Sequence, residues 1–377
     1  MKIYLFYHSV ISDWNHGNAH FLRGIVTAFL RDGHEVKIYE PANGWSLQNL
    51  INMKGTSVIE SFREYFPGHL PELYHVDHLN PAEILHDADL VLVHEWNDPK
   101  LVKSIGDYRA EHAHFILFFH DTHHRAVTSP DEMRRYDLRH YDGVLAFGEV
   151  LRKIYLKKGW ARRVWTWHEA ADTTIFHPMN KAREKEGDLV WIGNWGDEER
   201  TTELKEFIIN PVRKLGLKAA FYGVRYPAHA IRLLRRAGIE YKGWIPNYLV
   251  PQVFSRYSLT VHVPRKPYVT KLPGIPTIRP FEAMASGIPL LCSPWQDSEQ
   301  LFAEGADYLR ASGGKEMTEQ LDRVLNDEKL SASLSSKGLA TVRERHTCFH
   351  RADELFRILE ELRGEPEAGR RNLKNNR

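Results

Sequence analysis

A strand, a helix and a second strand follow one another at the start of the chain, and this succession constrains the fold more than any other feature. Residues 2–7 are predicted to form a buried strand. Phe21, Ile25 and Phe29 then recur at helical spacing, and residues 35–39 form the next strand. Strands joined through a helix pair in parallel, so the sequence predicts an α/β fold.

A second series of strands and helices follows a charged, unpatterned segment, which we interpret as a linker between domains. Strands are expected at residues 189–192, 217–222 and 259–263. The chain is therefore predicted to contain two doubly wound parallel sheets. The predicted boundaries are 1–178 for the N-terminal domain, 179–187 for the linker, 188–345 for the C-terminal domain, 346–363 for a helix that crosses back to the first domain, and 364–377 for a disordered tail.

The composition argues against several classes of protein. A net charge of +2 over 377 residues does not predict nucleic-acid binding. Two cysteines, Cys292 and Cys348, are too few for a disulfide framework and fit a reducing compartment. No apolar run is long enough to span a membrane, and no histidine spacing predicts a metal site. We therefore expect a cytoplasmic protein without a bound metal and with at most peripheral membrane contact.

Polar residues follow neighbouring strands of the predicted first sheet. One expected strand runs into His94-Glu95-Trp96, and the next runs into His120-Asp121. The carboxyl ends of parallel strands meet at one edge of a sheet, where open α/β sheets bind ligands. A single histidine of this kind is often structural. The strand-end position of His120 beside Asp121 favours a functional role, because histidine can carry a proton near neutral pH.

Residues 276–291 predict a loop, a short helix, a glycine stop and a strand. Thr277 can cap this helix, and Gly287 suits its left-handed end. Free N–H groups at such a helix start bind anions, and Arg279 adds a positive charge. Glu282 lies among apolar residues, where a carboxylate needs a partner such as a sugar or ribose diol. A surface-facing Glu282 on an ordinary helix is equally compatible with this stretch.

The loop at residues 193–201 carries a weaker signal for phosphate. Gly193, Gly196 and Arg200 stand next to the predicted helix start at Thr201, which is a plausible cradle for an anion. A plain connection between a strand and a helix explains the same residues.

The order of these pieces resembles the retaining GT-B glycosyltransferases of the glycosyl transferases group 1 superfamily. Residues 282–289 are similar to its E-A-M-A-x-G-x-P segment, and residues 33–36 are similar to its G-H-E-V pattern. Residues 119–121 resemble its T-x-H-D strand end, residues 172–178 its linker, and residues 241–245 a further family segment. The arginine two residues before Phe-Glu resembles the spore-maturation-type branch.

The resemblance implies two Rossmann-like domains that face a cleft, with a nucleotide-sugar donor held mostly by the C-terminal domain. The sugar would pass with retention to a sugar, lipid-linked or small-molecule acceptor, and no metal or cofactor is implied because basic residues and helix ends neutralise the departing diphosphate. The implied catalytic residues are His120 and Asp121 near the reacting sugar and Glu282 at the ribose. The implied donor-binding residues are Gly17, Gly193, Asn194, Arg200, Arg225, Trp244, Ile245, Thr277, Ile278, Arg279 and Glu282. The expected acceptor contacts are Trp14, His16, Glu95 and Trp96.

One position departs from the family pattern. The family has a glutamate eight positions before the one that corresponds to Glu282, and this chain has Gly274 there. The contacts of the donor sugar therefore stay open, as do two alternative functions. One is a nucleotide-sugar 2-epimerase that recruits carboxylates such as Glu95, Asp121 and Glu169, and the other is a catalytically silent binding protein on the same fold. The nucleotide, the sugar and the acceptor are not identified by the sequence.

Overall fold

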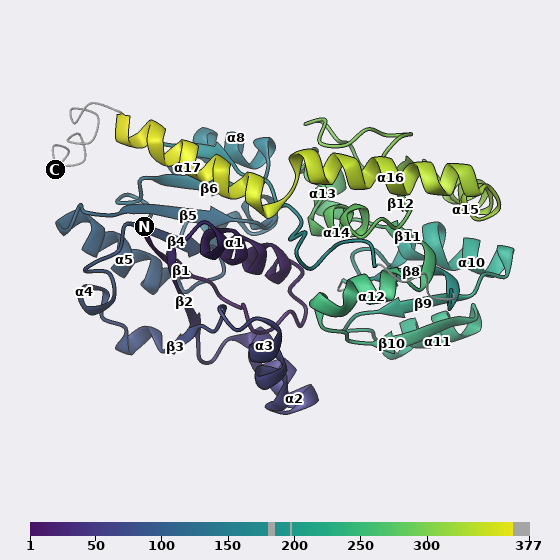
Figure 1. Cartoon of the computed structure of the whole chain (residues 1–377), viewed down its shortest axis with the longest axis horizontal. Helices are drawn as coiled ribbons and strands as arrows, with labels where there is room; N and C mark the ends of the chain where they lie inside the picture. The colour runs from purple at the N-terminus through teal and green to yellow at the C-terminus, as the bar shows by residue number, and fades with distance from the viewer. Residues whose placement is uncertain (180–184, 197, 365–377) are drawn as a thin grey trace. The chain divides into compact units, whose positions relative to one another are not determined.

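The computed structural model describes residues 1–179, 185–196 and 198–364, and the chain divides into two compact units (Figure 1). Unit 1 comprises residues 1–11, residues 25–168 and the described residues from Cys348 onward, and unit 2 comprises Ser12–Gly24 and Glu169–Thr347. Each unit contains one sheet, and all paired strands run parallel. The predicted α/β class with two parallel sheets is confirmed. Most of the predicted linker (180–184) and tail (365–377) lies outside the described residues.

The sheet of unit 1 has the strand order β3-β2-β1-β4-β5-β6-β7. Strands β1, β4 and β5 are buried along almost their whole length, as expected for a parallel sheet that is covered on both faces. The strands are β1 (Lys2–Phe6), β2 (Glu35–Pro41), β3 (Glu72–Tyr74), β4 (Leu90–His94), β5 (Ile116–Asp121), β6 (Gly143–Ala146) and β7 (Val164–Thr166).

The C-terminal helix α17 (Cys348–Gly364) belongs to unit 1 and packs beside the later part of α1 (Ala19–Arg31). The rings of Phe356 and Phe29 lie 5.7 Å apart, and the Arg31 guanidinium lies 4.0 Å from the centre of the Phe349 ring. The other helices of this unit are α2 (Trp45–Lys54), α3 (Ser57–Tyr65), the 3-10 turn η1 (Val76–His78), α4 (Pro81–Ile84), α5 (Pro99–Glu111), α6 (Arg125–Thr128), α7 (Pro130–Met133) and α8 (Glu149–Lys158).

The sheet of unit 2 has the strand order β10-β9-β8-β11-β12-β13. Alternate residues of its central strands, such as Leu189, Trp191 and Phe221, point into one hydrophobic core. The strands are β8 (Gly187–Ile192), β9 (Ala219–Tyr222), β10 (Ile239–Gly243), β11 (Tyr257–His262), β12 (Leu290–Cys292) and β13 (Leu309–Arg310).

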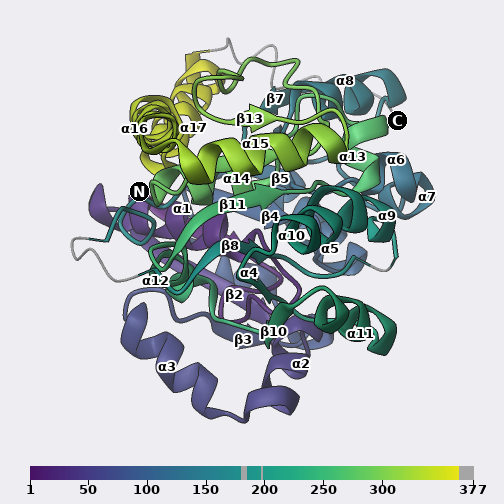
Figure 2. The ribbon, with the colours of Figure 1, turned by 90° about the vertical axis from the view of Figure 1, so that its right-hand side faces the viewer.

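Helices α10 (Asn210–Leu215), α11 (Ala228–Arg236) and α15 (Gly314–Asn326) contribute Val212, Leu234 and Leu321 to that core, and Figure 2 presents α15 in front of the sheet. The remaining helices are α9 (Thr201–Leu204), the π-helical turn η2 (Lys205–Ile209), the 3-10 turn η3 (Asn247–Leu249), α12 (Val250–Phe254), α13 (Lys266–Thr270), α14 (Ile278–Ala285) and α16 (Glu328–Arg345). No helix in the described part of the chain is long and apolar enough to cross a membrane.

Candidate active site

Glu282 lies on α14, a short helix that is enclosed on almost every side. Seven of its eight residues are buried, and the side chain of Glu282 has no exposed surface. Pro280 is tolerated because it stands in the first turn, where its missing N–H would have no helical partner. A carboxylate in such surroundings requires hydrogen-bonding or charged partners. The surface-facing alternative for Glu282 is therefore wrong.

Three side chains of unit 2 hold the Glu282 carboxylate. Asn247 Nδ2 donates to Oε1 at 2.7 Å, and His20 Nδ1 lies 3.1 Å from the same oxygen. Arg279, one turn before Glu282 on the same helix, donates to Oε2. Burial raises the pKa of Glu282, but the positive charge of Arg279 and the contacts of His20 and Asn247 outweigh it, so the pKa lies below its ordinary value. Glu282 is therefore an ionised carboxylate at neutral pH.

The tautomer of His20 follows from its second contact. The backbone N–H of Asp172 donates to His20 Nε2 at 2.7 Å. A backbone N–H can only donate, so Nε2 carries no proton and the ring proton is on Nδ1, which faces Glu282. The sequence motifs identified neither His20 nor Asn247. Both contacts join residues that are far apart in the chain, and only the polar character of the preceding loop marked the neighbourhood of His20.

Asp13 connects the loop after β1 to the predicted base-binding residue Trp244. Its carboxylate accepts a hydrogen bond from Trp244 Nε1 at 3.0 Å and from the Asn247 backbone N–H at 2.8 Å. Arg23 Nη1 lies 3.1 Å from the same carboxylate. Asp13 therefore fixes the Trp244 indole and, through Asn247, the position of Glu282.

The start of α14 is built differently from the sequence-based expectation. Thr277 is the residue before the helix, but its side chain makes no capping hydrogen bond. Its backbone has φ 61° and ψ 177°, a conformation that non-glycine residues adopt only under strain and that is concentrated at ligand-binding sites. Because the Thr277 side chain does not cap the helix, it leaves the first N–H groups of α14 without a side-chain acceptor. Such N–H groups attract anions.

Basic groups gather near this helix start. Arg200 donates to the carbonyl oxygens of Val263 and Asn194 at 2.8 and 2.5 Å, while its buried Nε has no hydrogen-bond partner. Burial and the positive charge of Arg265 lower the pKa of Arg200 to about 9. Burial, with the charges of Arg200 and Arg279, lowers the pKa of His262 to about 3. Burial is the main cause of both shifts, and the neighbouring positive charges add to it, so an anionic ligand would stabilise the charged forms.

The loop residues that were predicted to bind the donor have surroundings that differ from one residue to the next. A Cβ on Gly17 would lie 3.4 Å from Ile278 Cγ2, so Gly17 passes close to the start of α14. Asn194 donates to Asn15 Oδ1 at 2.7 Å. Arg200 occupies the N-cap position that was predicted for Thr201. Further along the chain, Arg225 is exposed and has φ 60°, Ile245 is partly buried, and a Cβ on Gly193 would meet the Trp191 ring at 2.9 Å.

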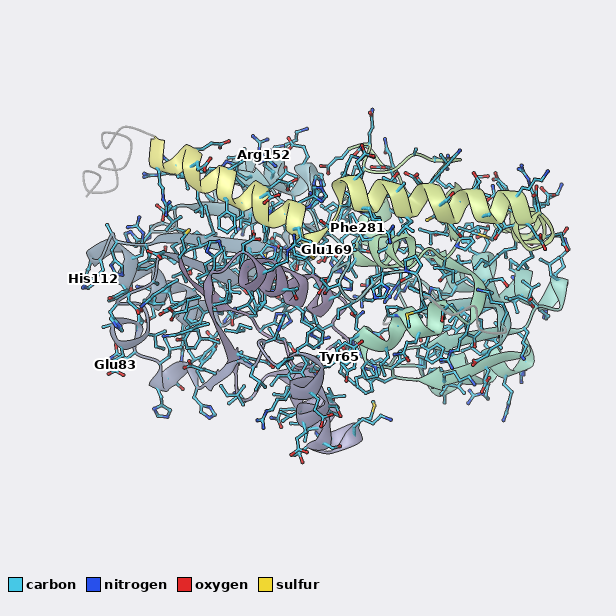
Figure 3. The ribbon with its side chains drawn as sticks, in the orientation of Figure 1. Tyr65, Glu83, His112, Arg152, Glu169 and Phe281 are labelled. Carbon is cyan, nitrogen blue, oxygen red and sulfur yellow. The ribbon has the colours of Figure 1, made fainter. Side chains whose placement is uncertain are left out.

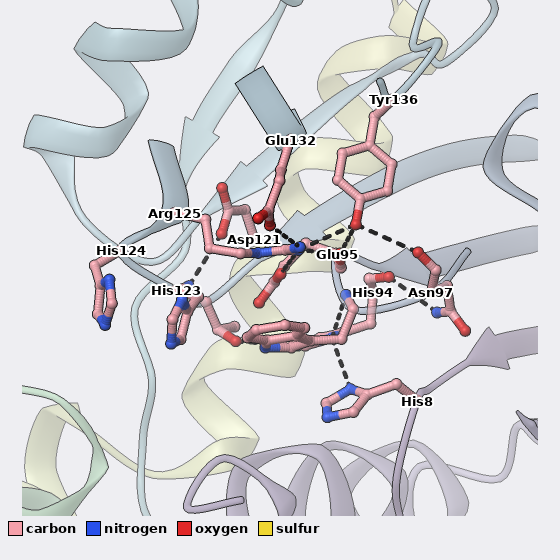
Figure 4. A network of polar contacts seen from close by, with 12 residues as sticks. His8, His94, Glu95, Asn97, Asp121, His123, His124, Arg125, Glu132 and Tyr136 are labelled. Atoms are coloured by element: carbon pink, nitrogen blue, oxygen red, sulfur yellow. Dashed lines mark hydrogen bonds and ion pairs between the residues drawn. The ribbon is translucent and has the colours of Figure 1, made fainter. Parts of the chain in front are cut away.

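Unit 1 contains a separate polar network at the carboxyl ends of its strands (Figure 4). Arg125 at the start of α6 contacts the carboxylate and the carbonyl oxygen of Glu95, and its guanidinium lies 4.0 Å from the centre of the Trp96 ring. The Tyr136 hydroxyl also contacts the Glu95 carbonyl. Glu95, an expected acceptor contact, has no exposed surface and is tied to Arg125, whereas Trp96 is 41% exposed.

Histidines of neighbouring strand ends contact one another in this network. His8 Nδ1 and His94 Nδ1 lie 3.1 Å apart, and His94 Nε2 lies 3.0 Å from Thr122 Oγ1. The His120 ring packs edge-on against the rings of His94 and Trp167 at 5.3 and 4.8 Å. Burial lowers the pKa of His120 to about 3, so the ring is neutral at physiological pH.

The side chains of Asp121 and His120 have different surroundings. The two residues follow each other on β5, and successive strand residues point to opposite faces of a sheet. Asp121 instead accepts hydrogen bonds from the Tyr155 hydroxyl at 2.7 Å and from the His123 backbone N–H at 3.0 Å. Burial raises the pKa of Asp121 against the effect of these bonds.

The two other expected acceptor contacts are Trp14 and His16. They belong to the segment Ser12–Gly24 of unit 2 and are 7% and 8% exposed. Within the described ranges, no group of three or more His, Cys, Asp or Glu side chains could hold a metal ion. Unit 2 thus contains one buried carboxylate with its partners and a positively charged helix start, and unit 1 contains a histidine and arginine network of its own.

Two α/β units, each with one sheet of parallel strands, are typical of the GT-B class of fold. Comparison with known proteins agrees. Residues 200–357 match the model of a family described as glycosyl transferase-like. The resemblance to GT-B glycosyltransferases is confirmed at this level. No curated protein matches the chain significantly in sequence.

Solved structures share the fold at low sequence identity. HepE of Anabaena in complex with UDP and glucose is 14% identical with a TM-score of 0.65, and sucrose-phosphate synthase of Thermosynechococcus elongatus is 13% identical with a TM-score of 0.64. An alpha-glucosyltransferase in complex with UDP-glucose and DNA containing an abasic site is 11% identical with a TM-score of 0.68. Each comparison covers 96% of this chain and 99% of the other.

Proposed function

We propose that the protein is a glycosyltransferase that moves a sugar from a nucleoside diphosphate sugar to an acceptor. The observation that carries this proposal is the ionised, fully buried Glu282, which Asn247 and His20 hold beside the uncapped start of α14. A fixed carboxylate suits the hydroxyl groups of a ribose, and free N–H groups with arginines suit a diphosphate. UDP is the first candidate nucleotide, because several structural neighbours were solved with UDP or UDP-glucose.

The charges of unit 2 suit the departure of a nucleoside diphosphate. Negative charge develops on the leaving group as its bond to the sugar breaks, and fixed positive groups lower the free energy of that transition state. Arg200 and Arg279, with the N–H groups of α14, are the proposed groups. We propose on this basis that no divalent metal is needed, and that the sugar is transferred with retention, as the family resemblance implies.

In unit 1 we assign His120 to contact with the reacting sugar and Trp96 to contact with the acceptor. His120 is neutral, so its ring can donate one hydrogen bond and accept another without adding charge. Trp96 offers an exposed aromatic surface of the kind that binds sugars. A sugar, lipid-linked or small-molecule acceptor is proposed rather than nucleic acid, because the net charge is only +2.

A thermal-shift screen tests the proposal. Addition of UDP, GDP, TDP or ADP should raise the melting temperature for at least one nucleotide, and the shift should disappear in Glu282→Ala. Product analysis by NMR with and without an acceptor then identifies the reaction, because epimerisation of the donor requires no acceptor. A wild-type protein that responds to none of the four nucleotides contradicts the proposal.

A further inference from the structure

Glu169 is a buried carboxyl group whose hydrogen-bonding capacity is unused. It opens the longer segment of unit 2 and is 2% exposed, and neither of its side-chain oxygens has a hydrogen-bond partner. Buried polar groups are rarely left in this state, and the exceptions need an explanation such as a ligand. The proposed glycosyl transfer assigns no role to this residue.

The segment that carries Glu169 is fixed to the Glu282 site. Three residues further on, the Asp172 N–H donates to the His20 ring that faces Glu282. Between them, the Ala171 N–H donates to the His346 carbonyl at 3.0 Å. Glu169 is among the residues that Figure 3 labels. Burial and the negative charge of Glu282 raise the pKa of Glu169 well above its ordinary value.

Two carboxyl groups in different protonation states offer complementary chemistry. Glu282 is ionised, and although Asn247 and His20 contact Oε1, Oε2 contacts Arg279 alone among the described residues and can accept a further hydrogen bond. Burial without a hydrogen-bond partner raises the pKa of Glu169 and favours its protonated form, which can donate one hydrogen bond. A vicinal diol both donates and accepts hydrogen bonds, so it matches a carboxylate next to a carboxylic acid.

We propose that Glu169 donates a hydrogen bond to a vicinal diol of the nucleotide-sugar donor, in partnership with Glu282. The inference rests on the proposed function, because it takes the donor as its ligand. The diol belongs either to the ribose or to the transferred sugar, and both present the same chemistry to the two residues. Glu169 is thus a donor-binding residue that forms a hydrogen bond with a hydroxyl group of the diol.

Calorimetric titration of wild type, Glu169→Gln and Glu169→Ala with UDP, 2′-deoxy-UDP and UDP-glucose tests the inference. Loss of one hydrogen bond should weaken binding by about tenfold in Glu169→Ala. Glu169→Gln keeps a neutral donor and should remain within about threefold of wild type, which separates a lost hydrogen bond from a damaged fold. Glu319→Gln, an exposed residue of α15, is the control and should bind as wild type does.

The pattern of loss identifies the diol. If Glu169 bonds to the ribose, Glu169→Ala binds UDP more weakly than wild type does. The ratio of its affinities for UDP and 2′-deoxy-UDP is then also smaller than in wild type. If Glu169 bonds to the transferred sugar, Glu169→Ala binds UDP as wild type does and binds UDP-glucose more weakly. Unchanged affinity for both ligands in Glu169→Ala overturns this inference alone, whereas a wild-type protein that binds no nucleotide overturns the proposed function as well.

Infrared spectroscopy of the free protein provides a test without any ligand. A protonated carboxyl group has a carbonyl band that ionised carboxylates lack, and at pH 7 Glu169→Gln should lack the Glu169 part of this band while the part from Glu95, whose pKa burial raises to about 8, remains. Identical spectra for the two proteins would overturn the inference even if nucleotides bind.

Discussion

The His20 ring stands between Glu282 and the backbone of Asp172, with Nδ1 3.1 Å from Glu282 Oε1 and Nε2 accepting the Asp172 N–H at 2.7 Å. The second contact forces the proton onto Nδ1, so a neutral histidine faces the carboxylate. His20 and the main-chain segment at Asp172 therefore orient Glu282 without neutralising it. The charge that balances Glu282 comes from Arg279.

Glu282→Ala should weaken the binding of the nucleoside diphosphate that stabilises the wild type. Hydrogen bonds to a charged group contribute about 1.5–3 kcal/mol each, so the loss of one or two corresponds to at least about tenfold in affinity. Calorimetric titration measures the effect. Glu304→Ala, which removes a half-exposed carboxylate of the same unit, is the control and should bind normally. Equal affinities in wild type and Glu282→Ala would contradict the assignment.

Gly274→Ala should destabilise the protein more than Gly305→Ala does. Both glycines have positive φ, 94° and 84°, so each substitution introduces backbone strain of about 1 kcal/mol. A Cβ on Gly274 would also lie 2.6 Å from Ser298 Oγ and 2.9 Å from Glu299 Oε1, whereas a Cβ on Gly305 meets nothing within 4 Å. Urea denaturation should show a larger loss for Gly274→Ala. Similar losses in the free energy of unfolding for the two variants would show that the loop around Ser298 can rearrange without destabilising the protein.

The same geometry disfavours a glutamate at position 274, the residue that the family resemblance implies there. A side chain at this position would have an unfavourable backbone conformation and would displace the side chains of Ser298 and Glu299. Restoring the glutamate is therefore expected to damage this loop rather than to restore a sugar contact.

Sequence patterns located the parts of the site that depend on local structure. The strand-helix periodicity predicted both sheets, and the apolar run around Glu282 predicted α14. The contacts of Glu282 with His20 and Asn247 were missed because they arise from tertiary packing, which local spacing does not encode. The different surroundings of His120 and Asp121 were also missed, because successive residues of a strand send their side chains to opposite faces.

Thr277→Gly should raise the free energy of unfolding by roughly 1 kcal/mol. Glycine relieves a strain of about 1–3 kcal/mol at φ 61° and ψ 177°, and loses about 0.5–1 kcal/mol through the greater freedom of the unfolded chain. Thr318→Gly, inside α15, offers no strain to relieve and should lower the same free energy by about 1 kcal/mol. Denaturation of both variants provides the comparison, and destabilisation of Thr277→Gly would show that the strain is absent.

Removal of divalent metals should leave transfer activity unchanged. Arg200, Arg279 and the start of α14 are proposed to neutralise the leaving diphosphate, a role that a metal ion fills in other sites. Activity measured with EDTA should match activity measured with added Mg²⁺ or Mn²⁺. Arg279→Ala should lower activity at least about tenfold in both conditions, and rescue of this variant by a metal would indicate that a cation can take the place of the guanidinium.

His262 should make the folded protein sensitive to acid. Burial, with Arg200 and Arg279 nearby, lowers its folded pKa from 6.5 to about 3, so between these values the unfolded chain binds a proton that the folded protein does not. The free energy of unfolding should therefore fall as the pH drops below 6.5, by up to about 1.4 kcal/mol per pH unit from this residue. His262→Asn cannot bind that proton and should show a shallower fall. Urea denaturation of both proteins between pH 4.5 and 7 measures the two slopes. Parallel slopes would mean that His262 binds its proton equally well in the folded state, for example because the anion site holds a buffer ion that offsets the arginines.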